Sequence, residues 1–275
     1  MRQANELMRG TPPKQHLRVA GLQVGCFAPS VEANLACLQR HLREVSPGEA
    51  DLIVLPELIN TYYHYEVMER LRPGEEEEFL APIRQAAREK RAHILAGSLA
   101  VREAKKLRNR SFLLSPEGAT IATYDKMHLI TLLGETEHFT PGRRRAVAEI
   151  RGWKLGIAIC FDIRFAELFL NYALDGCHLV AVPACWPSER AHHWRHLHLA
   201  RAQECQCFFL GVNAGGFDGR DKTYGGSILA SPDSVPVLEL PWGSEGTLAA
   251  AVSSDEIARQ MKLYDLMSGR KRPPI

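Results

Sequence analysis

The sequence predicts an α/β protein in which helices cover the outer faces of its sheets. Three features of the 275 residues lead to this class. Short apolar runs typical of strands alternate with longer runs that have helical periodicity. Two of the strands, 110–115 and 120–125, are joined by Pro116-Glu117-Gly118, which indicates a hairpin. Later strands are separated by helices, which indicates crossover connections, so both kinds of connection occur in the chain.

The first half of the chain supplies strands with two helices between them. In the segment 31–45, Leu35, Leu38 and Leu42 recur at helical spacing, and a Pro-Gly pair ends the helix. A second helix, 75–91, begins with acidic residues and ends with basic ones, as the helix dipole favours. The strands expected in this half are 17–25, 51–57, 93–101, 110–115 and 120–125.

The second half resumes the alternation after a long loop without periodicity, 126–145. The elements expected here are strands at 154–160, 178–184, 207–213, 224–231 and 246–252, with helices at 162–176 and 189–206. No linker, repeat or low-complexity tract divides the chain. We therefore expect a single domain over residues 15–275, preceded by a mobile N-terminal extension over residues 1–14.

The composition favours a globular protein that binds neither nucleic acid nor membrane. The chain is 45% hydrophobic and 24% charged, with a formal net charge of +2. A charge so close to zero gives no reason to expect an anionic polymer or membrane as partner. No apolar run reaches the ~18 residues that cross a bilayer. Seven irregularly spaced cysteines and no secretory leader predict reduced thiols and a cytoplasmic location.

The stretch GIAICFDIRFAEL, residues 156–168, places a cysteine where a buried strand ends and a helix is expected to begin. A helix start carries partial positive charge and free backbone N–H groups. That setting lowers the pKa of a thiol and favours a nucleophilic thiolate at Cys160. It also offers the N–H of Phe161 to an oxyanion forming beside the sulfur. The alternative is an inert buried cysteine, which is our interpretation of most of the other six.

Two further charged residues also stand where predicted strands end. Glu57 follows the apolar run LIVLP, and partial desolvation there suits a general base that must also return a proton. Lys126 follows the strand TIATYD, where an ammonium group could stabilise a thiolate and then an oxyanion. An exposed loop glutamate and a surface lysine are the ordinary alternatives. Strand ends that lie side by side in a sheet would bring Glu57, Lys126 and Cys160 together.

Other residues that could carry chemistry have simpler explanations. Trp186 lies between two prolines after a strand, where it forms either a pocket wall or ordinary packing. His192 and His196 are four residues apart, but no acidic residue follows at a ligand spacing, so packing or surface roles are favoured over a metal site. The glycines of 213–219 lack the pattern of a nucleotide-binding loop. We expect neither a metal nor a cofactor.

Several short motifs together point to one family. In order along about residues 17–255, they are LPE (55–57), YDKMHL (124–129), GETEHFTPG (134–142), CFDIRFAEL (160–168), PACWP (183–187) and HWRHLHLARAQE (193–204). With these motifs the sequence resembles the nitrilase superfamily of carbon–nitrogen hydrolases. The resemblance implies an α-β-β-α sandwich of two mixed sheets flanked by helices. It also implies a homodimer or a larger homo-oligomer.

The resemblance further implies which residues act. Glu57 would be the general base, Lys126 the oxyanion stabiliser and Cys160 the nucleophile. Glu135, in the loop after the lysine, matches a second active-site glutamate that orients Lys126 and the substrate. No cofactor is implied, and the expected partner is a small-molecule amide.

Within the superfamily, CFDIRFAEL looks like the omega-amidase branch, whose members hydrolyse the terminal amide of 2-oxoglutaramate and 2-oxosuccinamate. The chain departs from the common pattern at RAQEC (201–205) and at Cys185. Two alternatives stay open. The first is hydrolysis of an N-carbamoyl amine or another linear amide, and the second is a catalytically silent binding or scaffold subunit. An intact set of Glu57, Lys126 and Cys160 argues against the silent subunit.

Overall fold

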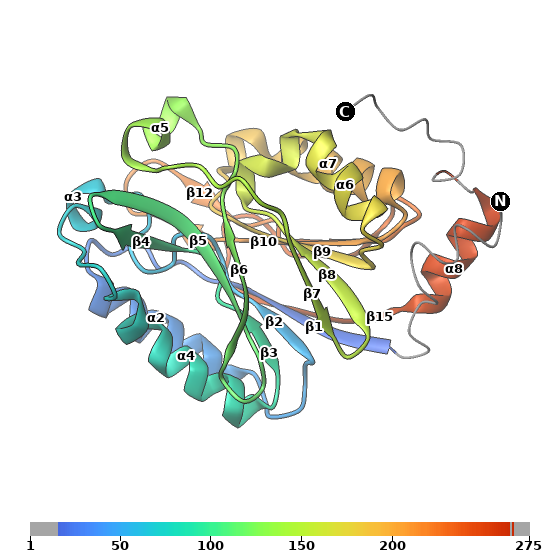
Figure 1. Cartoon of the computed structure of the whole chain (residues 1–275), viewed down its shortest axis with the longest axis horizontal. Helices are drawn as coiled ribbons and strands as arrows, with labels where there is room; N and C mark the ends of the chain where they lie inside the picture. Colours follow the sequence, from blue (N-terminus) through green and yellow to red (C-terminus); the bar gives the residue numbers. More distant parts are fainter. Residues whose placement is uncertain (1–15, 265, 267–275) are drawn as a thin grey trace.

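Two sheets packed face to face, with helices on both outer faces, form the core of the computed structural model (Figure 1). The structure describes residues 16–264 and 266. The four layers confirm the predicted α-β-β-α class. The N-terminal extension predicted over residues 1–14 lies outside the described residues.

The first sheet has seven strands and is mixed in direction. In spatial order they are β15 (Gly246–Ser253), β1 (His16–Gln23), β2 (Leu52–Val54), β3 (His93–Leu95), β5 (Lys106–Leu114) and β4 (Leu99–Glu103), with β6 (Thr120–Asp125) also paired to β5. The pairs β1–β2 and β2–β3 are parallel, because a helix connects each pair. The strand β15 and the hairpin formed by β5 and β6 pair in the antiparallel direction.

The second sheet has six strands and repeats this plan. Its order is β14 (Pro236–Glu239), β13 (Ile228–Ala230), β10 (Phe208–Asn213), β9 (Leu179–Ala184), β8 (Trp153–Ile157) and β7 (Ala146–Ile150). The three strands β8, β9 and β10 run parallel. A separate short ribbon pairs β11 (Gly216–Phe217) with β12 (Thr223–Tyr224).

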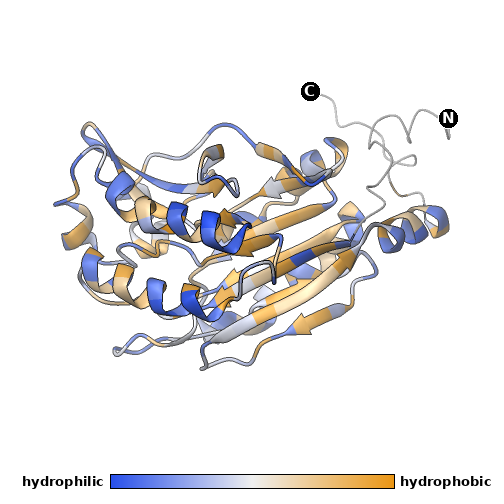
Figure 2. Ribbon diagram, turned by 90° about the horizontal axis from the view of Figure 1, so that it is seen from below, coloured by the Kyte–Doolittle hydropathy of each residue, from blue (hydrophilic) through white to orange (hydrophobic). Residues whose placement is uncertain are grey.

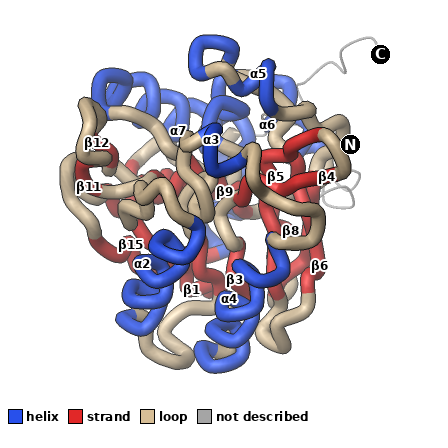
Figure 3. Tube along the Cα trace, turned by 90° about the vertical axis from the view of Figure 1, so that its left-hand side faces the viewer, coloured by secondary structure: helices blue, strands red, loops and turns tan. Residues whose placement is uncertain are grey.

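The helices lie outside the two sheets and at one end of them. Helices α2 (Val31–Glu44) and α4 (Glu76–Lys90) cover the first sheet, and α6 (Ala166–Leu174) and α7 (Ala191–Cys205) cover the second (Figure 1). Figure 3 looks onto the end that carries the short helices α3 (Tyr65–Met68) and α5 (Glu135–His138). The remaining elements are α8 (Ser254–Leu263) and the 3₁₀ helices η1 (Thr131–Leu133), η2 (Cys160–Arg164) and η3 (Ser188–Arg190). No helix among the described residues is long and apolar enough to span a membrane.

Strand β2 shows why this sequence forms layers. Successive side chains of a strand point to opposite faces, so one strand can serve two cores. Leu52 and Val54 pack into the core between the two sheets. Ile53 and Leu55 pack into the core beneath α2 and α4. A central strand buried on both faces must be apolar throughout, and Figure 2 shows this contrast between apolar strands and helices with polar outer faces.

Glycines break two of the predicted strands. The segment 93–101 is two strands, because the chain turns at Gly97, where φ is +53°. A Cβ atom on Gly97 would lie 1.7 Å from the carbonyl oxygen of Pro56, so only glycine fits there. The segment 224–231 is likewise divided between β12 and β13, at Gly225 and Gly226, which both have positive φ.

Candidate active site

The three charged residues singled out from the sequence meet in the interior. Glu57 lies three residues beyond β2, Lys126 follows β6 directly, and Glu135 is the first residue of α5. The Nζ atom of Lys126 lies 2.8 Å from Oε1 of Glu57 and 2.7 Å from Oε1 of Glu135. The side chains of all three have 0% or 1% exposure, so the alternatives of an exposed loop glutamate and a surface lysine are wrong.

Lys126 is held as an ammonium ion by these two carboxylates. Burial by itself would lower the pKa of Lys126, but the negative charges of Glu57 and Glu135 outweigh it and raise the pKa well above its usual value. Burial also raises the pKa of Glu135, and the nearby ammonium group opposes that rise. The site therefore keeps a fixed positive charge in the interior of the protein.

Cys160 is the first residue of η2 and is buried beside these charges. Its φ of +47° is unusual for a residue other than glycine, which marks a constrained turn at this point. Burial, followed by the charge of Glu57, raises the pKa of the Cys160 thiol well above its usual value, although Lys126 opposes this. The predicted lowering of this pKa is therefore wrong. The resting group is a thiol close to the charge of Glu57, and it requires a base to become a nucleophile.

The local helix at Cys160 also differs from the prediction. The segment 162–176 is not one helix, because η2 occupies residues 160–164 and α6 begins only at Ala166. The first hydrogen bond of η2 runs from the N–H of Asp162 to the carbonyl of Ile159, at 3.0 Å. Phe161 comes before Asp162 in the chain, and the first N–H groups of a helix have no partner within that helix. The N–H of Phe161 is one of these groups.

The strand ends do not lie side by side in one sheet, as the sequence led us to expect. Strands β2 and β6 belong to the first sheet and are separated by β3 and β5, whereas β8 belongs to the second sheet. The segments that follow these strands converge where the two sheets pack against each other. The packing of the sheets, and not strand adjacency, brings Cys160 to Glu57 and Lys126.

Two residues that the sequence analysis did not assign fix the carboxylate of Glu57. The side-chain amide of Asn109 donates to its Oε1 at 2.9 Å, and the backbone N–H of Cys185 donates to its Oε2 at 2.9 Å. The thiol of Cys185 contacts the backbone carbonyl of Glu57 at 3.1 Å. The departure at Cys185 therefore lies directly against the predicted general base. The other departure, Cys205, is buried and donates to the carbonyl of Phe169.

Glu135 is positioned by three donors. Besides Lys126, the backbone N–H of Ile130 donates to its Oε2 at 2.7 Å, and the hydroxyl of Tyr63 donates to its Oε1 at 3.2 Å. Because its hydroxyl reaches Glu135, the half-buried Tyr63 belongs to the same network.

Asp162 connects the turn at Cys160 to the segment that carries Lys126. Its Oδ2 accepts from the N–H of Ile159 at 2.9 Å and from the hydroxyl of Tyr124 at 2.8 Å. Its Oδ1 accepts from the backbone N–H of His128 at 3.0 Å. The fully buried Asp162 is thus a positioning residue that the sequence analysis did not identify.

Arg164 is close enough to Cys160 for their charges to interact, and its Nη2 atom lies 3.3 Å from Nδ1 of His193. The guanidinium group of Arg164 lies 4.6 Å from the ring centroid of Trp186 and 5.5 Å from that of Phe161. None of the ion pairs in the described part of the chain involves Arg164, and its Nε atom is buried without a hydrogen bond there. Burial lowers the pKa of Arg164, whereas Cys160 raises it, which places the two side chains in electrostatic reach. Trp186 is buried behind this arginine.

The histidines of α7 do not gather around these groups. His192 and His196 are exposed on the helix surface, and His198 is buried and bonds through Nδ1 to the carbonyl of Trp194 at 2.8 Å. Among the described residues, no cysteine, aspartate or glutamate completes a ligand cluster with His192 or His196.

Comparison with known families identifies this arrangement. A model of the carbon-nitrogen hydrolase family matches residues 18–261, which is most of the chain. The chain belongs to the carbon–nitrogen hydrolases. This family is the nitrilase superfamily that the motifs indicated, and the match includes every residue of the buried network described above.

Several proteins with amidase names are related to this chain along most of their length. The 2-oxoglutaramate amidase of Bacillus subtilis (strain 168) is 32% identical over 225 residues, covering 81% of this chain and 86% of the relative. The 2-oxoglutaramate amidase of Paenarthrobacter nicotinovorans is 30% identical over 277 residues, covering 97% and 93%. The omega-amidase YafV of Yersinia enterocolitica is 34% identical over 213 residues, covering 78% and 80%.

Solved structures share the fold of this carbon–nitrogen hydrolase. A CN-hydrolase superfamily protein from Xanthomonas campestris superposes with a TM-score of 0.85 at 25% identity, covering 94% of this chain and 99% of the other. Nit3 from Saccharomyces cerevisiae gives 0.83 at 23% identity, covering 94% and 97%. These matches agree with the two mixed sheets and flanking helices found here.

Proposed function

We propose that this carbon–nitrogen hydrolase is an amidase of the omega-amidase type. It cleaves the terminal amide of a small linear acid amide such as 2-oxoglutaramate to the acid and ammonia, through a thioester on Cys160. One observation carries this proposal: a thiol, a carboxylate and a buried ammonium ion meet around Lys126, with Glu57 bonded to it at 2.8 Å. The names of the related 2-oxoglutaramate amidases and omega-amidases support the choice of substrate.

The first half of the reaction forms the thioester. Glu57 removes the proton from the Cys160 thiol, and the sulfur attacks the amide carbon. The carbonyl oxygen becomes an oxyanion, which Lys126 and the N–H of Phe161 stabilise. Glu57 then transfers its proton to the amide nitrogen, the C–N bond breaks, and ammonia leaves.

The second half releases the acid. Glu57 removes a proton from a water molecule that attacks the thioester carbon, and the same donors stabilise the second oxyanion. The C–S bond breaks, and the proton held by Glu57 returns to the sulfur. Glu135 orients Lys126 throughout, because its carboxylate contacts the ammonium group that Glu57 also contacts.

Arg164 is the residue we assign to the carboxylate at the far end of the substrate. A planar guanidinium group binds carboxylates through two parallel hydrogen bonds. The stacking of Arg164 on Trp186 fixes its plane, and its buried Nε atom lacks a partner among the described residues. Phe161 and Trp186 would form the apolar walls between the reacting carbon and this arginine.

The decisive experiment measures ammonia released from a panel of amides. We expect turnover of 2-oxoglutaramate by the wild-type chain and by the control Cys177→Ala, and none by Cys160→Ala. Carbon dioxide as a co-product would select the N-carbamoyl amine reaction instead. No reaction with any amide of the panel would favour the silent scaffold subunit.

Arg164→Met separates substrate class from chemistry. We expect it to raise KM at least ~10-fold for the acid amide, which is the loss of a charge-assisted hydrogen bond, and to leave the turnover of a neutral short-chain amide nearly unchanged. Equal effects on both amides would contradict the assignment of Arg164 to a carboxylate.

We also propose that the chain assembles as a homodimer or a larger homo-oligomer and acts in the cytoplasm. Both proposals rest on the family and on the reduced state expected of the seven cysteines. Light scattering of the purified chain and localisation of a tagged chain test them. A monomer in solution would contradict the first.

A further inference from the structure

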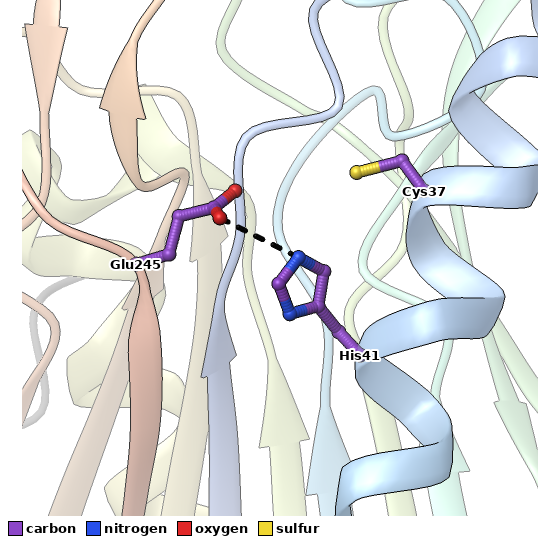
Figure 4. A group of neighbouring side chains, drawn as sticks. All are labelled: Cys37, His41 and Glu245. Atoms are coloured by element: carbon purple, nitrogen blue, oxygen red, sulfur yellow. Dashed lines mark ion pairs between the residues drawn. The ribbon is translucent and has the colours of Figure 1, made fainter.

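A second cluster of reactive side chains lies away from Lys126, between helix α2 and the start of β15. Cys37 and His41 are four residues apart on α2, so both point from the same face of the helix. Glu245 immediately precedes β15 and faces them (Figure 4). One ligand atom from each of Cys37, His41 and Glu245 lies within 4.8 Å of the other two.

The geometry of His41 fits a bridging ion better than a direct hydrogen bond. Its Nε2 atom lies 3.6 Å from Oε2 of Glu245, which is too long for a hydrogen bond. The same nitrogen is buried and has no hydrogen-bond partner in the described part of the chain. In a tetrahedral zinc site with bonds of ~2.0–2.3 Å, neighbouring ligand atoms are separated by roughly 3.3–3.8 Å. The separation of 3.6 Å falls within the range that two ligands of one metal ion span.

The surroundings hold these three groups in place. The N–H of Gly25 donates to Oε1 of Glu245 at 2.8 Å, which fixes the carboxylate. The Nδ1 atom of His41 lies 3.5 Å from Oε2 of the exposed Glu44. The guanidinium group of Arg40 lies 3.6 Å from Sγ of Cys37 and stabilises negative charge on that sulfur.

The donor set suits zinc. One sulfur, one imidazole and one carboxylate are ligands that Zn²⁺ accepts, whereas Mg²⁺ and Ca²⁺ prefer oxygen alone. Cys26, in the chain after β1, is buried but does not belong to the group whose ligand atoms lie within 4.8 Å of one another. Three protein ligands leave the fourth position of the tetrahedron to a water molecule.

We propose that Cys37, His41 and Glu245 bind a zinc ion whose fourth ligand is water. The ion links α2 to the start of the C-terminal strand β15. It would stabilise the fold and take no part in the amide chemistry. The proposal is independent of the proposed function, because none of these residues contacts Glu57, Lys126 or Glu135 in the interactions described above.

The test uses the full chain carrying Cys160→Ala, so that the active-site thiol cannot bind the metal. The protein is purified with a phosphine reductant, and Co²⁺ is titrated as a spectroscopic probe before its displacement by Zn²⁺. We expect one equivalent of metal per chain, with a sulfur-to-cobalt charge-transfer band. We also expect Zn²⁺ to raise the melting temperature, because it binds only the folded chain.

Variants identify the ligands. Cys37→Ser, His41→Gln and Glu245→Gln should each weaken Zn²⁺ binding at least ~10-fold. The controls are Glu239→Gln and His196→Gln, which change a half-exposed carboxylate and an exposed histidine elsewhere. These should bind as tightly as the parent protein.

Three outcomes would overturn the proposal. They are no uptake of Co²⁺ or Zn²⁺ at micromolar concentration, uptake that His41→Gln does not weaken, and loss of the metal in His196→Gln. Glu245 is partly exposed, so Glu245→Gln keeps the test valid if the cysteine variant fails to fold.

Discussion

The replacement of Glu135 by glutamine tests the network around Lys126 most directly. Glutamine has nearly the shape of glutamate but offers one acceptor oxygen and one NH₂ donor. All three groups that contact the Glu135 carboxylate are donors: the ammonium of Lys126 at 2.7 Å, the hydroxyl of Tyr63 at 3.2 Å and the N–H of Ile130 at 2.7 Å. Whichever way the amide turns, its NH₂ group faces a donor.

The size of the effect follows from that mismatch. The variant loses one charge-assisted hydrogen bond, which is worth about 1.5–3 kcal/mol. If this loss appears in full in the transition state, where Lys126 must be fixed, kcat/KM falls roughly 10- to 150-fold. Most of the loss should be in kcat, because Glu135 acts on the position of Lys126 and not on binding alone.

The assay is ammonia release by Glu135→Gln, measured beside Glu137→Gln. Glu137 lies two residues further on, in the same short helix α5, but its side chain is exposed. We expect the control to match the wild-type chain. Activity of a folded Glu135→Gln protein within about twofold of wild type would refute the reasoning, since it would mean that Lys126 needs only Glu57.

The same variant should change how stability depends on pH. Burial raises the pKa of Glu135 above the usual value of 4.5, so the folded chain binds this proton more tightly than the unfolded chain does. The resulting stability is fully present below pH 4.5 and is lost as pH rises through the folded-state pKa. Urea unfolding should therefore show the wild-type chain gaining stability relative to Glu135→Gln as the solution is acidified. An unchanged difference across that range would contradict the burial of an ionisable group at this position.

Two other substitutions probe the same centre. Lys126→Met leaves two buried carboxylates without a counter-ion, so we expect the free energy of unfolding, measured in urea, to fall by about 3–5 kcal/mol at neutral pH. Its kcat should fall at least ~100-fold, and a stable, active variant would contradict both statements. Asp162→Asn replaces a carboxylate that accepts hydrogen bonds from Ile159 and Tyr124 with an amide, so the free energy of unfolding should fall by about 1.5–3 kcal/mol and kcat should also fall. The control Asp175→Asn, whose ion-pair partner Arg145 is exposed, should change neither stability nor kcat. Equal effects of the two variants would contradict a positioning role for Asp162.

The layers of the fold could be predicted because local pattern and burial agree in the central strands. The run LIVLP is apolar throughout, which is what a strand such as β2, buried on both faces, must be. The predicted helices at 31–45 and 75–91 agree with α2 and α4 to within a residue at each end. Their apolar stripes face the first sheet and repeat at helical spacing.

Elements at the edges were missed because their local signals are weak. Strand β14 lies at the edge of the second sheet, where most of its side chains are half-buried. Its sequence therefore lacks the alternation of buried and exposed residues that reveals a strand. Strand β7 falls directly after the segment interpreted as a loop, and α5 and η1 lie inside that segment. Helix α8 did have a usable signal: Ser253 caps it by accepting from the N–H of Asp255, and acidic residues fill its first turn.

The charged residues of the site could be located from the sequence, but the residues that hold them through hydrogen bonds could not. Glu57 and Cys160 stand where apolar strands stop, and a polar residue at such a place is visible in a single sequence. Asn109 reaches Glu57 from 52 positions away, in the middle of β5, and nothing in its neighbourhood indicates that contact. The division of the predicted strand at Gly97 depends on the close approach of the Pro56 carbonyl group. This contact joins residues far apart in the sequence, so local pattern does not reveal it.

The charges of the site explain why its thiol rests in the protonated form. Around one ammonium ion stand two carboxylates, Glu57 and Glu135, and a thiolate would add a third negative charge in the protein interior. Transfer of the proton from Cys160 to Glu57 adds no charge, because the carboxylate becomes neutral as the sulfur becomes negative. The negative charge then moves from the sulfur to the carbonyl oxygen, which we place beside Lys126. A buried base next to the thiol therefore lets the reaction proceed without creating net charge in the interior, and a helix terminus at Cys160 is not needed to generate the nucleophile.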